Sequence, residues 1–229
     1  MAKNSVDDQY NGCAADMNNL VEKEDYLNKE IKANISGFGD AWSKSENKTK
    51  GKKLEPLKTK KHLIAIYVYT GIKGDLYKEF NQDVRTGIEK YKTNKFSWYT
   101  LYFWLTRAIQ TLKQTQKRCI STYRRTNVTF VVKNKEIRFG SFASSSLKRD
   151  VGHTFGNESC FEIKTCHGAN VTDYSWHPDQ KEVLIPPYET FEVTNIRKGK
   201  KDDWCKTVFV LNSTGIKSNL NCKLCKKIK

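Results

Sequence analysis

The sequence has no long hydrophobic run. Its longest apolar stretch, residues 63–69, has the length of a buried strand, whereas a helix that crosses a bilayer needs roughly 18–20 apolar residues. The chain also lacks a G-x-G-x-x-G turn, an internal repeat and a second Cys-x-x-Cys pair beside Cys222 and Cys225. These absences argue against a membrane-spanning chain, a Rossmann site, a repeat protein and a zinc site, so we expect no metal.

The sequence contains fewer arginine residues, and fewer acidic residues, than lysine residues. The 229 residues include 41 Lys and Arg against 25 Asp and Glu, a net charge of +16, yet only eight are Arg. Lysines gather over 44–61 and 223–229, and neither cluster is interleaved with aromatics, as a nucleic-acid-binding surface would be. The clusters favour a solvated lysine surface, with anionic glycans or cell surfaces as alternative partners and no specific nucleic acid.

Seven cysteines and six Asn-x-Ser/Thr sequons indicate an oxidising, secretory setting with disulfides. The sequons begin at Asn34, Asn47, Asn127, Asn157, Asn170 and Asn212. The chain starts without a basic-then-apolar leader and ends without the hydrophobic tail of a lipid-anchor signal. We therefore expect a mature or trimmed glycoprotein that is secreted or held on the extracellular face of the plasma membrane.

The first half of the chain has helical periodicity and the second half has the pattern of short strands. Apolar residues recur every three to four positions over 17–31, 76–91 and 96–117, with a lysine-rich loop at 43–61 and a strand at 62–70 between the first two. Strands are predicted from residue 119 and at 126–132, 135–139, 159–165, 182–185, 189–196 and 206–211. Helices before strands predict one α+β domain over 1–229, mainly helical over 1–117 and strand-rich over 118–229.

Two groups of polar residues lie near the start of the strand-rich half, and the first suits a phosphate-bearing ligand. The strand from residue 119 ends in Arg124 and Arg125, and an arginine fork binds a pyrophosphate through bidentate, charge-assisted hydrogen bonds. A second strand end, at 143–146, places the hydroxyls of Ser144 and Ser146 on one face. Each group alone is more typical of a solvated surface.

A third group precedes the apolar run at 183–187. If Gln180 and Glu182 are extended, they share a face, and the apolar run anchors that face to the core. A carboxylate held there stabilises a sugar oxocarbenium ion, as glycosidase carboxylates do. By itself this group is a weak signal for that chemistry.

The order of the three groups resembles the R–S–E signature of the arginine-type ecto-mono-ADP-ribosyltransferases. The likeness runs along the whole chain. Other segments resemble the family's mature start, its first core strand and its closing segment: Asn4-Ser5-Val6-Asp7-Asp8-Gln9-Tyr10 with Cys13, Ala65-Ile66-Tyr67-Val68-Tyr69-Thr70, and Ser218-Asn219-Leu220-Asn221-Cys222.

The resemblance implies the ADP-ribosyltransferase fold, in which N-terminal helices pack on two roughly perpendicular β-sheets and NAD lies in the cleft between them. By the motif match, Arg124 grips the NAD phosphates and Ser144 orients the nucleotide and the catalytic carboxylate. Glu182 would hydrogen-bond the nicotinamide ribose and stabilise the cation as nicotinamide leaves. Further residues expected at the NAD site are Tyr69, Ser146 and Phe155, the last by stacking on the nicotinamide. The implied substrate is NAD, with NADP left open, and we expect a monomer that acts on a protein acceptor or on water.

Two residues depart from the family's pattern. Arg125 stands where members commonly have Gly, and it either adds a phosphate contact or faces solvent. Gln180 stands at the first Glu of the Glu-x-Glu pair, which engages the acceptor guanidinium in arginine-modifying members. Because a neutral amide takes no proton from arginine, the sequence predicts NAD hydrolysis with poor transfer to arginine. Competent arginine transfer despite Gln180 and an inactive basic binding module remain the alternatives.

The resemblance also implies the disulfides. The family joins the cysteines at the places of Cys119 and Cys166, and its two chain ends are tied at Cys13 and Cys222. Among the remaining cysteines we expect a Cys205–Cys225 bridge, with Cys160 left free or buried.

Overall fold

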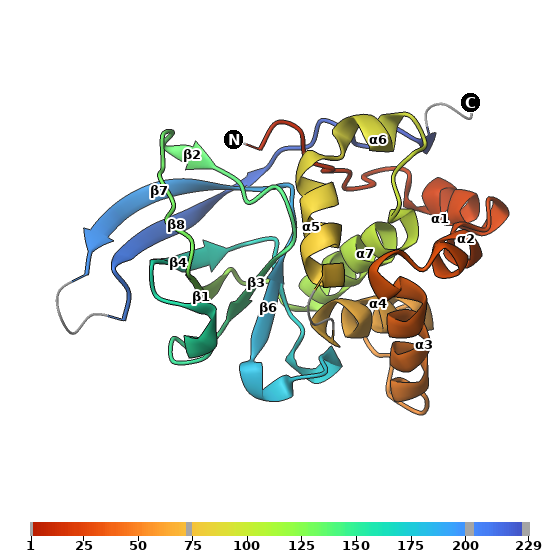
Figure 1. The fold of residues 1–229 in the computed structure, drawn as a ribbon, viewed down its shortest axis with the longest axis horizontal. Coiled ribbons are helices and arrows are strands. Elements are labelled where there is room, and N and C mark those ends of the chain that lie inside the picture. The colour runs from red at the N-terminus through yellow and green to blue at the C-terminus, as the bar shows by residue number, and fades with distance from the viewer. Residues whose placement is uncertain (1, 72–74, 200–203, 226–229) are drawn as a thin grey trace.

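The computed structural model describes residues 2–71, 75–199 and 204–225, with the helices in the first half of the chain and the strands in the second. Figure 1 shows the helices gathered at one side of the molecule and the sheet at the other, as expected of an α+β protein. The helices of the first half are α1 (Ala14–Lys23), α2 (Tyr26–Ala33), η1 (Ile35–Gly37), α3 (Phe38–Lys48), α4 (Lys60–Gly71), α5 (Asp75–Thr86), α6 (Ile88–Lys92) and α7 (Tyr99–Thr115).

The second half contains the strands and three short 3-10 turns. They are β1 (Ile120–Thr126), β2 (Glu136–Ile137), β3 (Ala143–Ser146), η2 (His153–Phe155), β4 (Ser159–Thr165), β5 (Ala169–Asn170), η3 (Thr172–Tyr174), η4 (Pro178–Gln180), β6 (Glu182–Ile185), β7 (Glu189–Lys198) and β8 (Thr207–Ile216). The strands predicted at 159–165 and 182–185 are confirmed at those bounds, and the next two are longer than predicted.

The eight strands form one hydrogen-bonded order, β2-β7-β8-β4-β1-β3-β6-β5. The two halves of this order meet at a single register pair between β1 and β3, Tyr123 with Ser146. In Figure 1, β6 runs across the direction of β7 and β8. The two sheets implied by the resemblance are therefore two differently directed halves of one sheet, and β1, β3 and β6 lie where they join.

The strand predicted at 62–70 is wrong, because this segment is helix α4. Residues 62–69 of this helix are all buried, and a helix that is apolar all round belongs in the interior of a protein. A fully buried helix and a buried strand give the same continuous apolar run, so periodicity does not separate them. Ala65–Thr70, which resembled a core strand, thus packs as part of the central helix.

Other predicted elements differ from the structure because of local backbone geometry or because a predicted strand has no neighbouring strand to pair with. The helical pattern over 17–31 is split into α1 and α2 at Asp25, whose φ of 51° is left-handed. Helix α3 occupies the first part of the loop predicted at 43–61. The strand predicted at 126–132 does not form, although the segment is rich in β-branched residues, because strand propensity needs a pairing neighbour. Only Glu136–Ile137 of the strand predicted at 135–139 pairs.

A buried ion pair fixes the start of the chain against the strand-rich half. Arg138 donates from Nη1 to the Asp7 carboxylate at 2.6 Å, with both side chains at most 1% exposed. The same carboxylate accepts the backbone N–H groups of Asn219 and Leu220 at 2.9 and 3.0 Å. Asp7 thus connects the segment before α1, the stretch that leads into β3 and the closing segment of the chain.

Three disulfides are present in the described part of the chain. Two of them, Cys13–Cys222 and Cys119–Cys166, confirm the expected pairs. The third joins Cys160 to Cys205, so the expected Cys205–Cys225 bridge is wrong and Cys160 is not a free thiol. Strand β4 and β8 run parallel, and Cys160 faces Val208 in their register. This pairing brings Cys160 beside the residues that lead into β8.

Among the described residues, no helix is both long and apolar enough to cross a membrane.

Candidate active site

Three neighbouring strands bring the predicted motif residues together. Arg124 lies on β1, Ser144 on β3 and Glu182 on β6, and these strands are consecutive in the sheet. Arg124 donates from Nη1 to the carbonyl oxygen of Ser144 at 2.6 Å. Ser146 lies opposite Glu182 in the β3–β6 register. Residues from three separate motifs therefore meet where the two halves of the sheet join.

Glu182 is a buried carboxyl, 6% exposed. Burial raises its pKa to about 7, while a hydrogen bond from the Ser144 side chain and the charge of Arg124 act in the opposite direction. Its charge therefore changes near neutral pH. In its ionised form, a buried carboxyl of this kind can stabilise a cation that forms beside it during a reaction.

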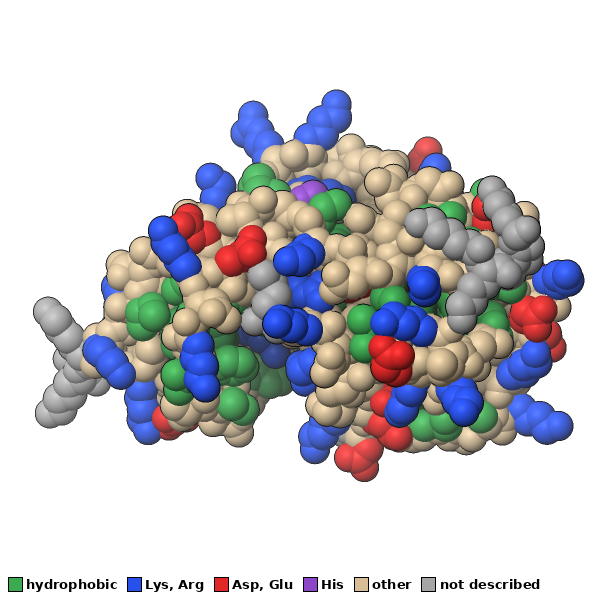
Figure 2. Space-filling view, turned by 90° about the horizontal axis from the view of Figure 1, so that it is seen from above, with side chains coloured by type: hydrophobic (Ala, Val, Ile, Leu, Met, Phe, Trp, Pro, Cys, Tyr) green, Lys and Arg blue, Asp and Glu red, His purple; other side chains and the backbone are tan. Residues whose placement is uncertain are grey.

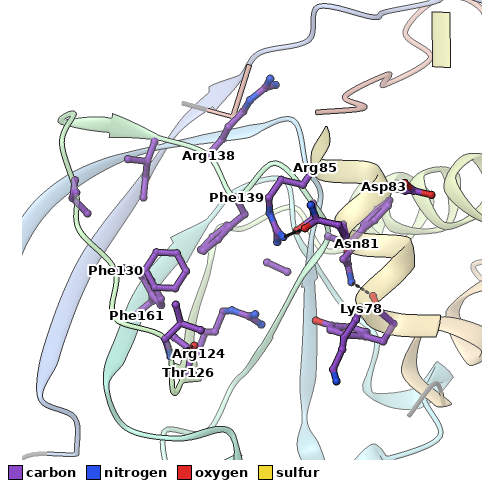
Figure 3. Close-up of a pocket in the computed structure, with 18 of the residues that line it drawn as sticks. Lys78, Asn81, Asp83, Arg85, Arg124, Thr126, Phe130, Arg138, Phe139 and Phe161 are labelled. Atoms are coloured by element: carbon purple, nitrogen blue, oxygen red, sulfur yellow. Dashed lines mark hydrogen bonds between the residues drawn. The ribbon is translucent and has the colours of Figure 1, made fainter. Parts of the chain in front are cut away.

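A pocket of about 1080 Å³ opens beside these strands, between α5 and the segment that follows β1. Its walls combine aromatic rings with basic and amide groups, among them Phe130, Phe139, Phe161, Lys78 and Asn81. Figure 3 shows Arg124 reaching in from the strands and Arg85 from the α5 side. Seen from above, the molecule is hollowed between its strand-rich and helical parts, with Lys and Arg side chains at the edge (Figure 2). Of the motif residues, Arg124 lines the pocket, whereas Ser144, Ser146 and Glu182 are not part of its lining. The Glu182 carboxyl is buried close enough to Arg124 for that charge to act on its pKa.

Arg85 and Asn81 belong to this pocket and were missed by the sequence analysis. Arg85 donates from Nη2 to Oγ of Ser141 at 2.8 Å, and burial and then the charge of Arg124 lower its pKa. Two guanidinium groups that oppose each other across a pocket favour an anion between them. The sequence does contain a signal for them, because residues 81 and 85 lie one helical turn apart, beside the apolar face of the predicted helix.

Tyr69 lies behind the pocket wall, 2% exposed. Its hydroxyl donates to the carbonyl oxygen of Phe142 at 3.2 Å and accepts from Nδ2 of Asn81 at 3.3 Å. Its ring packs on Tyr77 and Phe142, which line the pocket. The structure places Tyr69 where it supports lining residues.

Gln180 is not extended, so its predicted common face with Glu182 is wrong. Pro178 opens the 3-10 turn η4, which contains Gln180, and Lys181 follows with a left-handed φ of 48°. That backbone breaks the alternation of side chains on which the prediction depended. The carbonyl oxygen of Gln180 accepts from Oγ of Ser146 at 2.7 Å, so the turn is still tied to the site.

Two further residues lie outside the pocket lining. Phe155, in η2, is 58% exposed, and its stacking on a nicotinamide remains a prediction. Arg125 neither joins the pocket nor simply faces solvent. Its guanidinium lies 4.9 Å from the ring centroid of Trp204, and it donates to the carbonyl oxygens of Trp204 and Arg149 at 2.9 and 3.3 Å. Arg125 therefore fastens loops beside β1.

The lysine cluster at 44–61 covers the end of α3, the following loop and the start of α4. Three of its ammonium groups lie over aromatic rings: Lys48 over Trp176 at 5.3 Å, Lys52 over Tyr67 at 5.6 Å and Lys61 over Trp104 at 4.8 Å. Within the described ranges, no three His, Cys, Asp or Glu side chains gather as a metal site would require.

Comparisons with known proteins agree with this geometry. The family model described as "NAD:arginine ADP-ribosyltransferase" matches residues 1–218. The "NAD(P)(+)--arginine ADP-ribosyltransferase 2" of Gallus gallus is 36% identical, covering 99% of this chain and 72% of the relative. The "GPI-linked NAD(P)(+)--arginine ADP-ribosyltransferase 1" of Mus musculus is 34% identical, covering 100% and 74%. A crystal structure of a variant of the eukaryotic mono-ADP-ribosyltransferase ART2.2 in complex with NAD has a TM-score of 0.79 at 30% identity, covering 97% of this chain and 96% of that one.

Proposed function

Because the chain belongs to the NAD:arginine ADP-ribosyltransferase family of enzymes, we propose that it cleaves NAD and passes the ADP-ribose to water in preference to arginine. The observation that carries this proposal is the buried carboxyl of Glu182 beside Ser144 and Arg124, because Arg124 also lines a large pocket together with Arg85. Each chemical requirement of NAD then has a counterpart among these residues.

The pocket suits the adenosine and pyrophosphate of NAD. Arg85 and Arg124 supply two guanidinium groups for the pyrophosphate, and the aromatic wall offers rings to an adenine. Asn81 is 5% exposed, and no donor among the described residues reaches its Oδ1 atom. A buried acceptor without a donor favours a ligand hydroxyl, such as one on a ribose.

Glu182 is assigned to the reacting centre. The bond between C1′ of the ribose and the nicotinamide nitrogen breaks, and nicotinamide leaves as a neutral molecule with the bonding electrons. The ionised Glu182 carboxylate stabilises the oxocarbenium ion that remains. A water oxygen then bonds to C1′ and loses a proton to solvent, which gives free ADP-ribose.

Gln180 is the reason for placing water ahead of arginine. Its amide is neutral and cannot accept a proton from a guanidinium group whose pKa lies above about 12. The competing function is transfer to protein arginine, which the names of the relatives favour. The three disulfides and the GPI-linked relative from Mus musculus support an extracellular setting for either reaction. NADP remains an alternative substrate.

Product analysis tests the proposal. The protein is incubated with NAD and agmatine, and nicotinamide, free ADP-ribose and ADP-ribosyl-agmatine are quantified from one reaction. We expect nicotinamide and free ADP-ribose in equal amounts, with little agmatine product. Nicotinamide matched mainly by ADP-ribosyl-agmatine would establish arginine transfer instead, and no nicotinamide release at micromolar protein over hours would overturn NAD cleavage.

A further inference from the structure

Asn127 lies at the rim of the pocket, three residues beyond Arg124. The residues on either side of it, Thr126 and Val128, both line the pocket, whereas the Asn127 side chain is exposed. The backbone N–H of Val128 donates to Oγ1 of Thr126 at 2.9 Å, which closes a turn with Asn127 at its tip. Asn127 also begins a sequon with Val128 and Thr129. The rim of the pocket therefore presents an asparagine in an N-glycosylation sequence.

The Asn127 side chain makes no hydrogen bond to the described part of the chain, unlike the side chains of two other sequons. Oδ1 of Asn34 accepts the backbone N–H of Gly39 at 2.8 Å. Oδ1 of Asn170 accepts both the N–H and the hydroxyl of Thr172, at 2.9 and 2.6 Å. No hydrogen bond from the side chain of Asn127 reaches any described residue. A glycan at Asn127 therefore displaces no contact of the fold.

The surface beside Asn127 is unusually apolar for a part exposed to water. Val128 is 55% exposed, Phe130 44% and Val131 76%. These three residues lie in one segment that makes no strand pairing, and they form the outer edge of the pocket. Contiguous exposed apolar side chains are uncommon unless something covers them. A bulky, hydrophilic glycan attached next to them is such a cover.

A second sequon lies at the same edge. A Cβ atom placed on Gly156 would lie only 2.6 Å from the Cβ of Asn127, and Asn157 is the next residue. The backbone N–H of Glu158 donates to the carbonyl oxygen of Thr126 at 3.0 Å, which holds the two segments together. Two sequons therefore lie close together at one end of β1 and β4.

We propose that Asn127 carries an N-linked glycan that covers the apolar rim of the pocket and keeps macromolecules from its mouth while free dinucleotide enters. The glycan forms when Nδ2 of Asn127 bonds to C1 of a lipid-pyrophosphate-linked oligosaccharide. The bond from C1 to the pyrophosphate oxygen breaks, the lipid pyrophosphate leaves, and the amide nitrogen loses one proton. The barrier to macromolecules rests on one part of the proposed function, namely that the dinucleotide binds in this pocket.

The first measurement is the occupancy of Asn127. The protein is produced in a eukaryotic secretory cell line and treated with peptide N-glycosidase in ¹⁸O-labelled water, and the peptides are analysed by mass spectrometry. We expect Asn127 to be converted to labelled aspartate in most molecules. An unmodified Asn127 in protein that is glycosylated at other sequons would overturn the proposal.

The second measurement is binding, which does not depend on turnover. N127Q replaces the asparagine of the sequon, and T129V replaces its threonine, so each removes the glycosylation signal in a different way. The matched control is N212Q, which removes a sequon on β8. Each is combined with E182Q, and the affinities for free NAD and for dextran-linked NAD are measured by titration calorimetry. We expect N127Q and T129V to strengthen binding of dextran-linked NAD about tenfold, with free NAD within about twofold and N212Q unchanged.

The outcomes separate this proposal from the proposed function. Equal binding of dextran-linked NAD to N127Q, T129V and N212Q would overturn the barrier even if Asn127 is occupied. The opposite result is also possible: the Asn127 glycan is present and the binding difference is seen, but the protein with Glu182 intact releases no nicotinamide. That result would overturn NAD cleavage and leave the glycan barrier standing.

Discussion

Arg124 donates a 2.6 Å hydrogen bond from its guanidinium Nη1 to the backbone carbonyl oxygen of Ser144. This bond joins β1 to β3, which share only one register pair, so the arginine helps to hold the two halves of the sheet together. The charge of Arg124 also acts on Glu182, where it opposes the effect of burial on the pKa. The side chain that would bind the NAD phosphates thus also shapes the site where the glycosidic bond would break.

Replacing Glu182 by Gln tests the assigned carboxylate. We expect E182Q to lower nicotinamide release by at least about a hundredfold, because a neutral amide gives the oxocarbenium ion no charge partner. The matched control is E162Q on β4, whose carboxylate pairs with Arg197 outside the pocket. Initial rates at saturating NAD are compared after both variants are shown to keep the disulfides and to be fully folded under the assay conditions. Near-normal turnover of E182Q would mean that another group stabilises the cation.

The pH dependence of NAD cleavage follows from the ionisation of Glu182. Its pKa of about 7 predicts that kcat/KM rises with pH up to about 7 and then levels off, since the free enzyme must hold the carboxylate ionised. S144A removes a hydrogen bond that lowers this pKa and should move the inflection to higher pH. The measurement is kcat/KM between pH 4.5 and 9 for both proteins. An inflection near pH 4 to 5 would indicate a solvated carboxyl.

The same ionisation affects folding. The pKa of Glu182 is about 7 when folded and about 4.3 when unfolded, so its contribution to stability is complete below the unfolded value and is lost as pH rises through 7. The full loss is about 4 kcal/mol. Urea unfolding of the natural protein and of E182Q at pH 5 and 8.5 should therefore show E182Q gaining relative stability at the higher pH. The raised pKa values of Glu30 and Asp8 act equally in both proteins and cancel. A difference that is independent of pH would contradict the buried carboxyl.

Arg85 provides a test of the pocket as the dinucleotide site. We expect R85Q to raise KM for NAD about tenfold or more while kcat stays within about threefold, because a charge-assisted hydrogen bond contributes roughly 1.5–3 kcal/mol to binding. R118Q, at an exposed position before β1, is the matched control. Steady-state kinetics in NAD measure both. An unchanged KM in R85Q would place the pyrophosphate elsewhere.

The motif strands could be predicted from the sequence because their signals are local. Arg124 lies near the end of a β-branched and aromatic strand, and Glu182 begins an apolar run closed by two prolines, so each residue has a local strand signal. Their meeting point followed from the family resemblance, as did two of the three disulfides.

The misses arise from tertiary context. The segment of α4 looks like a strand because all its faces are buried, and Cys160 pairs with Cys205 because β8 lies beside β4, a neighbour relation that spacing does not reveal. Arg85 sits on a helix far from the motifs in sequence and reaches the site only through packing. An extended Gln180, two residues before the predicted strand at 182–185, is wrong because Lys181 is left-handed, and lysine gives no signal for a conformation that it rarely adopts.

Gln180 decides the last prediction, which concerns where the ADP-ribose goes. Q180E places a carboxylate in the turn η4, whose backbone is already bonded to Ser146 and which leads directly into Glu182. A guanidinium acceptor gains a charge-assisted pair there, roughly 1.5–3 kcal/mol, or about ten- to a hundredfold in transfer rate if fully expressed in the transition state.

We therefore expect Q180E to raise ADP-ribosylation of agmatine by that order while hydrolysis stays within a few-fold. Q180A is the matched control: it also changes the side chain but supplies no charge, so it should leave agmatine modification low. Lys181 follows directly and is half-buried, so its ammonium competes for the new carboxylate, and K181A combined with Q180E should increase transfer further. Robust transfer to agmatine by the natural protein, equal in Q180E, would show that the acceptor is activated without a carboxylate at this position.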